Sequence, residues 1–296
     1  MYKINFQKPI HIHFIGIGGI SMSGLAEILL EEGFTVSGSD AKESPLTKKL
    51  ESEGAVIHYG QCAENITDDI NCVVYTAAIN KSNPELMEAV GKKIPMLTRA
   101  ELLGQLMKNY DTPIAVSGTH GKTTTTSMIS EVLLAADMDP TISVGGILKT
   151  IGGNIRVGKS GNFITEACEY TNSFLHFYPK ISVILNIEED HLDFFKDLED
   201  IRHSFHQFSA LLPSDGTLII NGDIKDYQEI YEGLDCNVIT YGSSAEFDYS
   251  ATEIQYDEKG FVSFELLKHN TSCGRVQLSV TGDHNVSNAL AALATA

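Results

Sequence analysis

The 296-residue sequence has little positive charge, no paired cysteines and no long apolar segment. Its 21 lysines and arginines stand against 39 acidic residues, and the resulting net charge of −18 argues against nucleic acid or an anionic membrane as a partner. No uninterrupted apolar run reaches the roughly 18 residues that a membrane-spanning helix needs. The five cysteines lie far apart without a C-x-x-C pair, which excludes a zinc-knuckle or disulfide framework and predicts a cytoplasmic protein.

The pattern of apolar residues predicts an α/β protein of two domains, because short apolar runs alternate with amphipathic stretches. We place the boundary near residue 110, before the helix-breaking Asp111-Thr112-Pro113. The first domain has predicted strands at 10–15, 34–37, 55–58 and 72–76, and predicted helices at 21–32, 45–53, 84–90 and 98–109. The second has predicted strands at 113–117, 162–166, 181–187 and 217–220, predicted helices at 122–136, 197–212 and 285–296, and further edge strands within 236–280.

The segment GTHGKTT, residues 118–124, follows a predicted strand and opens a predicted helix. Glycines at such a turn let main-chain N–H groups point inward, and a helix N-terminus adds about half a positive charge. This arrangement predicts a phosphate site in which Lys122 reaches a β- or γ-phosphate and the Thr123 hydroxyl binds Mg²⁺. Only two residues separate the glycines instead of the usual four, so a plain glycine turn with a solvated Lys122 is the alternative.

Polar residues end the two strands that follow this segment. Glu166 closes the strand NFITE, and Asn186, Asp190, His191 and Asp193 follow the strand ISVILNI. Ligands of open α/β sheets gather at the carboxyl ends of the strands. A carboxylate facing the 118–124 loop would complete a magnesium site, as it does in P-loop nucleotide hydrolases. Taken singly, each residue is also explained as an ordinary surface or packed residue.

A second glycine turn, FIGIGGISMSG, also joins a predicted strand to a predicted helix. Gly16 and Gly18 fit the dinucleotide-binding pattern G-x-G-x-x-G, but Ser21 stands where the third glycine belongs. Asp40 ends the second strand, where a ribose-binding acid is expected. This turn alone predicts an NAD-dependent dehydrogenase or a tight turn without a ligand. Because a dehydrogenase leaves the GTHGKTT loop unexplained, the two turns together predict two phosphorylated ligands.

Seven motifs resemble the Mur ligases and occur in the order found in that family: HFIGIGGISMSGLAEIL, SGSD, LTRAELL, GTHGKTTTT, EACEY, NIEEDHLD and GDHNVSNALAA. The resemblance is strongest to the branch that adds L-alanine. It implies a Rossmann-like UDP-sugar domain at 1–110 with a parallel sheet, and a P-loop-type ATP-binding α/β domain at 111–296. The uncapped predicted helix at 285–296 agrees with a fragment that lacks the family's third domain, which carries the amino-acid site.

The resemblance implies an ATP-dependent ligase of peptidoglycan synthesis that uses Mg²⁺ and joins L-alanine to the lactyl carboxylate of UDP-N-acetylmuramate through an acyl phosphate. We expect this fragment to bind nucleotides without forming product, as a monomer or weak homodimer. Implied ATP contacts are Gly118, Thr119, His120, Gly121, Lys122, Thr123, Thr124, Asn285 and Asn288. Implied magnesium ligands are Thr123, Glu166 and His191. Implied catalytic residues are Lys122, Glu166, His191 and Asn186, the last beside the substrate carboxylate. Implied UDP-sugar contacts are Gly16, Gly18, Gly19, Ser21, Met22, Asp40, Thr76, Arg99 and His120.

The sequence departs from the family pattern at three places. Thr76-Ala77 stands where many relatives have two serines, Gln61 stands where histidine is common, and HSFHQF at 203–208 lacks the modified lysine of sister ligases. The missing lysine fits the alanine-adding branch. The alternatives that remain open are a dehydrogenase, a non-catalytic UDP-sugar-binding module and, within the family, a recycling ligase that attaches a whole tripeptide.

Overall fold

The computed structural model describes residues 2–76 and 78–296, and the chain forms two compact units that meet between Asn109 and Tyr110. Asn109 ties down the start of the chain, because its side chain accepts from the Phe6 N–H at 3.1 Å and donates to the Ile4 carbonyl at 3.2 Å. No helix among the described residues is long and apolar enough to cross a membrane.

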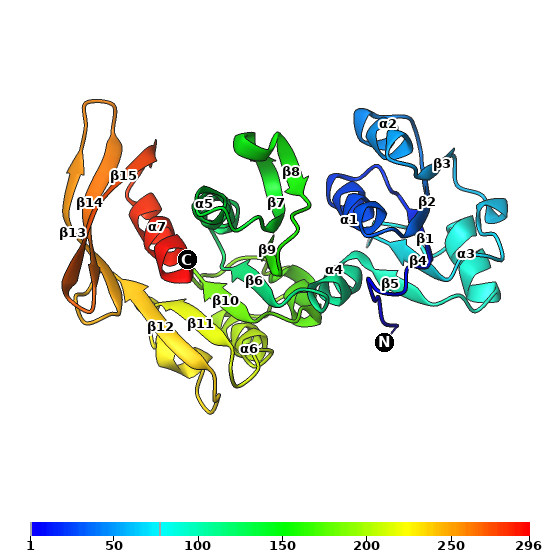
Figure 1. Ribbon diagram of the computed structural model, residues 1–296. Coiled ribbons are helices and arrows are strands. Elements are labelled where there is room, and N and C mark those ends of the chain that lie inside the picture. Colours follow the sequence, from blue (N-terminus) through cyan, green and yellow to red (C-terminus); the bar gives the residue numbers. More distant parts are fainter. Residues whose placement is uncertain (1, 77) are drawn as a thin grey trace. The chain divides into compact units, whose positions relative to one another are not determined.

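The first unit is a five-stranded parallel sheet in the order β3-β2-β1-β4-β5, with helices between the strands (Figure 1). The strand order reverses between β1 and β4, and a ligand crevice opens at such a point, beyond the carboxyl ends of the strands. The strands are β1 (His11–Ile15), β2 (Thr35–Asp40), β3 (Val56–Tyr59), β4 (Cys72–Tyr75) and β5 (Met96–Thr98). The helices are α1 (Ile20–Glu31), α2 (Pro45–Ser52), α3 (Pro84–Gly91) and α4 (Arg99–Met107), with a 3₁₀ turn η1 (Ala63–Asn65).

Three helices of this unit begin at capping residues that the sequence supplies. The Ser44, Asn83 and Thr98 side chains accept main-chain N–H groups in the first turns of α2, α3 and α4. Helix α1 differs, because it begins after Gly19 without a side-chain cap. Its first N–H groups are therefore left for a ligand or solvent.

The second unit is a ten-stranded mixed sheet in the order β15-β14-β13-β12-β11-β10-β6-β9-β7-β8. Its parallel centre holds β6 (Thr112–Ser117), β9 (Asn162–Glu166), β10 (Ile181–Ile184), β11 (Thr217–Asn221), β12 (Asn237–Gly242) and β7 (Thr141–Leu148). Antiparallel pairing adds β8 (Gly153–Arg156) at one edge, and β14 (Phe261–Lys268) and β15 (Thr271–Thr281) beyond β13 (Tyr249–Tyr256) at the other. The helices are α5 (Lys122–Ala135), α6 (Leu198–Ser209) and α7 (His284–Thr295), with 3₁₀ turns η2 (Lys149–Ile151), η3 (Tyr170–His176) and η4 (Tyr227–Ile230).

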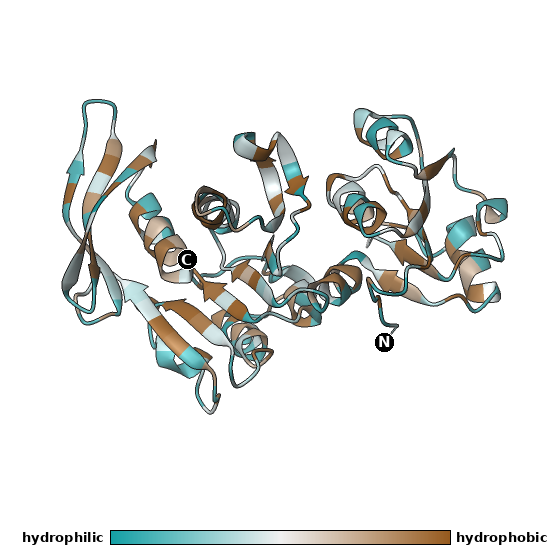
Figure 2. Ribbon diagram, viewed as in Figure 1, coloured by the Kyte–Doolittle hydropathy of each residue, from teal (hydrophilic) through white to brown (hydrophobic). Residues whose placement is uncertain are grey.

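Helices α5 and α7 lie together on one side of this sheet and α6 lies on the other (Figure 1). Ile129 of α5 and Leu290 of α7 share one core with Val116 of β6. The α6 side is aromatic, since the Phe174 ring stacks on Phe208 with ring centroids 4.6 Å apart. Figure 2 shows the apolar colouring of the central strands, whose residues are buried on both faces as parallel strands require.

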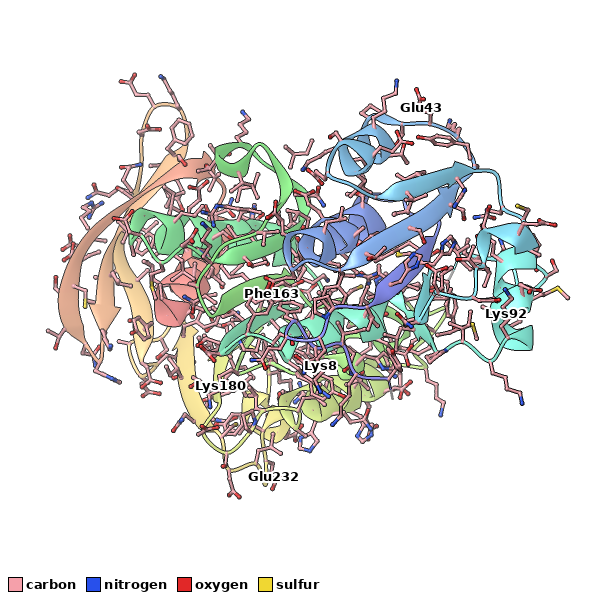
Figure 3. All side chains as sticks on the ribbon, turned by 45° about the vertical axis from the view of Figure 1, so that its right-hand side comes forward. Lys8, Glu43, Lys92, Phe163, Lys180 and Glu232 are labelled. Atoms are coloured by element: carbon pink, nitrogen blue, oxygen red, sulfur yellow. The ribbon has the colours of Figure 1, made fainter. Side chains whose placement is uncertain are left out.

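The side chains follow the same division between core and surface. Phe163 of β9 is completely buried and lies within the second unit in Figure 3. The labelled charged side chains Glu43 and Glu232 project away from the ribbon in the same view. The α/β fold class predicted from the sequence is therefore confirmed in both units.

Most predicted elements occur within a few residues of their expected ends, and three strands were missed. The missed strands are β5, β7 and β8; β5 has only three residues, glycines interrupt the apolar pattern of β7, and β8 (GNIR) has a single apolar side chain. Two predicted ranges end three residues too late. Strand β10 stops at Ile184 instead of residue 187, and α6 stops at Ser209 instead of residue 212.

A buried polar cluster supports the first unit beneath its glycine turn. The carboxylate of Glu85 in α3 is completely buried and accepts hydrogen bonds from the Ser39 hydroxyl at 2.6 Å and the Asn65 amide at 2.6 Å. The His13 Nε2 lies 3.8 Å from the same carboxylate. Burial raises the pKa of the Glu85 carboxyl, but the nearby His13 and the hydrogen bonds from Ser39 and Asn65 outweigh it and hold the pKa below its ordinary 4.5.

Replacing this carboxylate by an amide in Glu85→Gln should destabilise the first unit by about 1–3 kcal/mol, because an amide nitrogen then faces one of two hydrogen-bond donors. The urea midpoint at pH 7 measures the loss. Since the folded-state pKa is depressed, the difference from wild type should shrink as the pH falls below about 4.5 and the carboxylate protonates. The control Glu88→Gln, at a partly exposed site on the same helix, should change stability by less than about 0.5 kcal/mol. Equal midpoints for wild type and Glu85→Gln would contradict this account.

Candidate functional site

The loop between β6 and α5, residues 118–121, takes a main-chain path that only glycine allows at two positions. Gly118 has φ +144° and Gly121 has φ +85°. A Cβ at Gly118 would lie 2.9 Å from the Leu185 Cβ, and one at Gly121 would lie 2.7 Å from Oδ1 of Asn288. Gly121 precedes α5 without a side-chain cap, so the first N–H groups of α5 are free to bind an anion.

The end of β10 fixes this loop through hydrogen bonds. The Asn186 amide binds the main chain of His120 twice, accepting from its N–H at 2.7 Å and donating to its carbonyl at 3.0 Å. The Asn186 carbonyl accepts from the Thr119 N–H at 3.2 Å, and the Glu188 N–H donates to the Thr119 hydroxyl at 2.9 Å. Asn186 therefore holds the loop in shape, and the substrate contact expected from the sequence stays a prediction.

Two consecutive glycines of β7, Gly145 and Gly146, lie against two of the expected magnesium ligands, Glu166 and Thr123. The Gly145 N–H donates to Oε1 of Glu166 at 2.5 Å, and a Cβ at Gly145 would lie 2.8 Å from Oε2. A Cβ at Gly146 would lie 3.2 Å from the Cγ2 of Thr123. The Glu166 carboxylate and the Thr123 side chain thus lie against consecutive residues of one strand.

This pair fits magnesium by its chemistry, since Mg²⁺ prefers hard oxygen ligands and keeps several of its waters. The part of the chain that the structure describes contains no cluster of three or more His, Cys, Asp or Glu side chains suited to a metal. Any magnesium here would therefore rest on few protein ligands, with Thr123 and Glu166 as the oxygen donors. Such a site leaves coordination positions for phosphate oxygens.

The third expected ligand, His191, lies on the turn after β10. It has φ +51°, and its ring packs on Tyr170 with centroids 4.5 Å apart. The Tyr170 hydroxyl donates to Asp193 at 2.8 Å, and this bond and the charge of Asp193 raise the pKa of the tyrosine. The Nε2 of His191 is 3.8 Å from Asp190. These contacts orient the imidazole at the same edge of the sheet that carries Glu166.

Lys122 opens α5 and is held by three neighbours. Its ammonium donates to the carbonyls of Gly118 and Thr119 and to both oxygens of Glu169, at 3.0 and 3.2 Å. Glu169 is only 2% exposed. The sequence reading missed Glu169, although EACEY places a second carboxylate three residues after Glu166.

The first turns of α7 also reach the loop. Asn288 lies against Gly121, and its amide donates to Oδ1 of Asn285 at 2.9 Å. The Asn285 amide donates to the Thr281 carbonyl at 2.7 Å, and both asparagines are nearly buried. The structure therefore brings one of the two expected ATP contacts in α7, Asn288, directly to the glycine loop.

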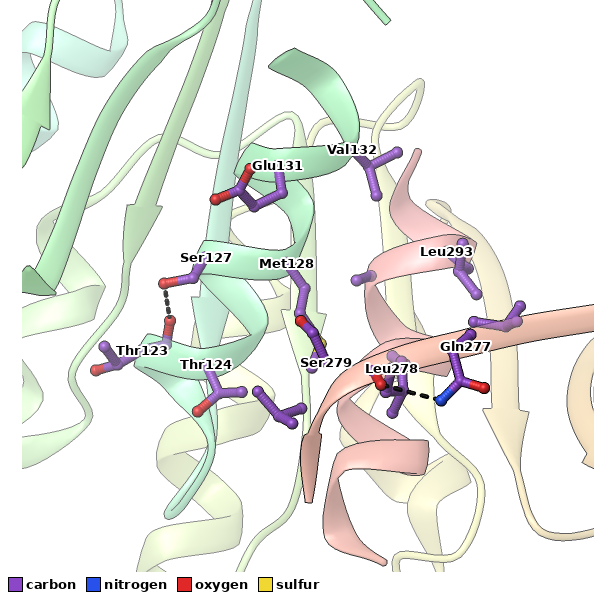
Figure 4. Close-up of a pocket in the computed structure, with 14 residues that line it drawn as sticks. Thr123, Thr124, Ser127, Met128, Glu131, Val132, Gln277, Leu278, Ser279 and Leu293 are labelled. Atoms are coloured by element: carbon purple, nitrogen blue, oxygen red, sulfur yellow. Dashed lines mark hydrogen bonds between the residues drawn. The ribbon is translucent and has the colours of Figure 1, made fainter. Parts of the chain in front are cut away.

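A cavity of about 550 Å³ lies between α5, α7 and β15 (Figure 4). Thr123 and Thr124 line it at the start of α5, and its other walls are mainly apolar, including Met128 and Leu293. Asn285 and Asn288 are not among its lining residues. The cavity thus begins one residue beyond Lys122 and continues along α5, as Figure 4 shows.

The glycine turn of the first unit is closed by Asp40 and by the end of β2. The Ser39 carbonyl accepts from the N–H groups of Gly16 and Ile17, at 2.8 and 2.9 Å. The Gly18 N–H donates to Oδ2 of Asp40 at 2.8 Å. A Cβ at Gly18 would lie 2.7 Å from that oxygen and 3.0 Å from Cγ2 of Thr47, so the turn packs closely against both side chains.

Other expected UDP-sugar contacts surround the start of α1. The Arg99 guanidinium donates to the Ser21 hydroxyl at 3.2 Å, which places a cation beside the uncapped helix. The Met22 side chain is buried, so only its main chain can face a ligand. The Thr76 hydroxyl accepts from the Ala78 N–H at 3.1 Å, whereas Ala77 lies outside the described residues.

Gln61, at the position where the family pattern often has histidine, bonds to another residue of the first unit. Its Oε1 accepts a hydrogen bond from the Asn83 amide at 2.6 Å. Asn83 in turn caps α3, one residue from the buried Glu85. Gln61 therefore has a structural partner in this chain.

Comparison with known families matches both units. A model described as "Mur ligase family, catalytic domain" matches residues 11–111, and one described as "Mur ligase middle domain" matches residues 116–296. Among curated relatives, the UDP-N-acetylmuramate–L-alanine ligase of Agathobacter rectalis is 64% identical over 294 residues, which cover 99% of this chain and 64% of the relative. That of Lachnospira eligens is 61% identical over 295 residues.

Solved structures give the same result. The UDP-N-acetylmuramate:L-alanyl-γ-D-glutamyl-meso-diaminopimelate ligase from Neisseria meningitides is 31% identical with a TM-score of 0.85, over 97% of this chain and 93% of that one. The UDP-N-acetylmuramate–alanine ligase from Thermotoga maritima is 29% identical with a TM-score of 0.80, over 97% of this chain and 64% of that one. The chain spans about 64% of the length of the first two curated relatives. On the matches to both units, this chain belongs to the Mur ligase family.

Proposed function

We propose that this chain carries the UDP-sugar and ATP sites of an ATP-dependent ligase that joins L-alanine to the lactyl carboxylate of UDP-N-acetylmuramate in peptidoglycan synthesis. The unit up to Asn109 would hold the UDP-sugar and the unit from Tyr110 would hold ATP. The observation that supports this best is the preformed loop 118–122 at the carboxyl end of β6, with Lys122, Thr123 and Glu166 grouped around it. The names of relatives at 61–64% identity support the substrates.

The loop suits phosphoryl transfer because that reaction depends on positioning and charge neutralisation more than on covalent help from the protein. N–H groups of residues 118–123 and the ammonium of Lys122 would bind the β- and γ-phosphates. Asn186 fixes this loop before the nucleotide arrives, so little ordering remains to be done on binding. His120 is largely exposed on the loop and would face the sugar substrate.

Magnesium, when bound, would neutralise phosphate charge. Thr123 and Glu166 would hold it through oxygen atoms, with His191 at the same edge. The lactyl carboxylate would then accept the γ-phosphoryl group, and the amine of L-alanine would displace phosphate from the resulting acyl phosphate. The Lys122 ammonium would stay beside the γ-phosphoryl group during its transfer and offset its negative charge.

In the first unit, the uncapped start of α1 would receive the diphosphate of the UDP-sugar. Gly19, Ser21 and Arg99 present a helix N-terminus and a guanidinium at one place. Thr76 directly follows β4, the strand on the other side of the point where the strand order reverses. UDP-sugar binding there agrees with the general position of ligands in open α/β sheets.

The alternatives have less support. For a dinucleotide, the pattern G-x-G-x-x-G calls for a third glycine, but Ser21 stands there. A non-catalytic UDP-sugar module would leave the ordered loop 118–122 without a purpose. A tripeptide-adding ligase is represented by a structure at 31% identity, whereas relatives named for L-alanine reach 64%.

The compartment and assembly remain part of the proposal. All five cysteines are free thiols, which suits the cytoplasm, where the substrates would be made and used. We propose a monomer or weak homodimer without nucleic-acid or membrane partners, in keeping with the net charge of −18.

The proposed reaction predicts that phosphate release from ATP requires both UDP-N-acetylmuramate and L-alanine. Replacing L-alanine by the tripeptide L-alanyl-γ-D-glutamyl-meso-diaminopimelate should lower the rate at least about tenfold, because a site built for one small amino acid excludes a longer chain. A coupled phosphate assay with the complete ligase, including the third domain that the family resemblance implies, measures both. Release that continues without the sugar would contradict the substrate assignment.

The role of the β7 glycines predicts a selective defect in Gly145→Ala. The new methyl group would lie 2.8–2.9 Å from the Glu166 carboxylate oxygens and displace them, while the flexible side chain yields with little loss of stability. We expect the affinity for Mg²⁺–ATP to fall about tenfold by calorimetry, with the unfolding midpoint within about 0.5 kcal/mol of wild type. The control Gly153→Ala in β8, where a Cβ meets no atom within 3.8 Å, should bind normally. Unchanged binding in Gly145→Ala would remove Glu166 from the proposed site.

A further inference from the structure

The Lys122–Glu169 ion pair gives the phosphate loop an unusual charge balance. Both carboxylate oxygens lie within 3.2 Å of the ammonium, and Glu169 is 2% exposed. A carboxylate that is buried to this extent needs a charged partner, because its hydration is lost. Lys122 supplies that partner, so its positive charge is already neutralised before any phosphate arrives.

The described residues around the loop do not supply positive charge to replace that of Lys122. Glu166 ends β9 and Glu169 lies three residues beyond it, and three more acidic residues, Glu188, Glu189 and Asp190, follow β10. These strands flank β6 on both sides. Against these five acidic residues the segment GTHGKTT has one lysine, Lys122. A triphosphate without a cation would therefore enter an acidic site.

Glu169 is held in place by the segment that follows it. Thr171 and Asn172 are both left-handed, with φ +54° and +56°, a conformation that costs non-glycine residues free energy and persists only where other contacts enforce it. The Ser204 hydroxyl of α6 donates to Oδ1 of Asn172, and the Asn172 N–H donates to the Glu169 carbonyl at 2.9 Å. The carboxylate is thus fixed opposite Lys122 and cannot simply swing into solvent.

We propose that Glu169 makes nucleotide binding conditional on a divalent cation, by neutralising Lys122 so that a bare triphosphate is rejected and only the metal–nucleotide complex is accepted. This inference rests on the proposed ATP site. Glu169 acts through Lys122 and is therefore a positioning and selectivity residue. Lys122 can still donate to a phosphate by releasing the neutral carbonyls of Gly118 and Thr119 while it keeps its bond to Glu169.

The test compares the affinity of the 296-residue chain for ATP with Mg²⁺ and for ATP in excess EDTA, by calorimetry. Wild type should bind well with Mg²⁺ and at least about tenfold more weakly without it. Glu169→Gln keeps the shape and a hydrogen bond to Lys122 but removes the charge. It should improve metal-free binding at least about tenfold and change Mg²⁺–ATP binding by less than about threefold.

Two variants separate this effect from general charge and from misfolding. Glu188→Gln removes a charge from a side chain that is 62% exposed beside His120, and it should change metal-free binding by less than about threefold. In a Lys122→Ala background, Glu169→Gln should raise the unfolding temperature above that of Lys122→Ala alone, because the unpaired carboxylate is gone.

The outcomes are distinguishable. No binding of Mg²⁺–ATP by wild type would reject the proposed ATP site itself. Normal Mg²⁺–ATP binding by wild type, with no gain of metal-free binding in folded Glu169→Gln, would reject only the selectivity role. Equal gains in Glu188→Gln and Glu169→Gln would also reject it, since bulk charge would then explain the effect.

Discussion

The close approach of the 118–121 loop to the end of β10 is the constraint on which the second unit depends. Gly118 and Gly121 leave no room for side chains, and the Asn186 amide binds the His120 main chain in both directions. This fixed turn sets where α5 begins, and hence where Lys122 and Thr123 stand relative to the ends of β9 and β10. A phosphate site formed in this way is preorganised, so binding need not order the loop.

The loop 118–121 lies between groups of opposite charge. The loop and the N-terminus of α5 favour an anion, whereas the carboxylates that end the flanking strands oppose one. Glu169 adds to the repulsion of an anion, because it pairs with Lys122, the only lysine of the segment 118–124. The two tendencies are compatible when the anion arrives with a cation, as in the proposed Mg²⁺–ATP complex.

The sequence predicted the fold class because apolar runs and glycine turns are local signals, and most strand and helix ranges follow from them. It missed β7 because Gly145 and Gly146 interrupt its apolar pattern, although these glycines are what lets the strand pass against Glu166 and Thr123. Glu169 was missed for another reason. Its partner Lys122 lies 47 residues away, and no spacing rule in a single sequence reveals a pairing at that distance.

The most direct measurement of the central claim is a crystal structure of the chain with Mg²⁺ and a non-hydrolysable ATP analogue. The account predicts the terminal phosphates against the N–H groups of residues 118–122, with the metal between them and the oxygens of Thr123 and Glu166. A nucleotide bound elsewhere with this loop empty, or a metal remote from Glu166, would contradict it.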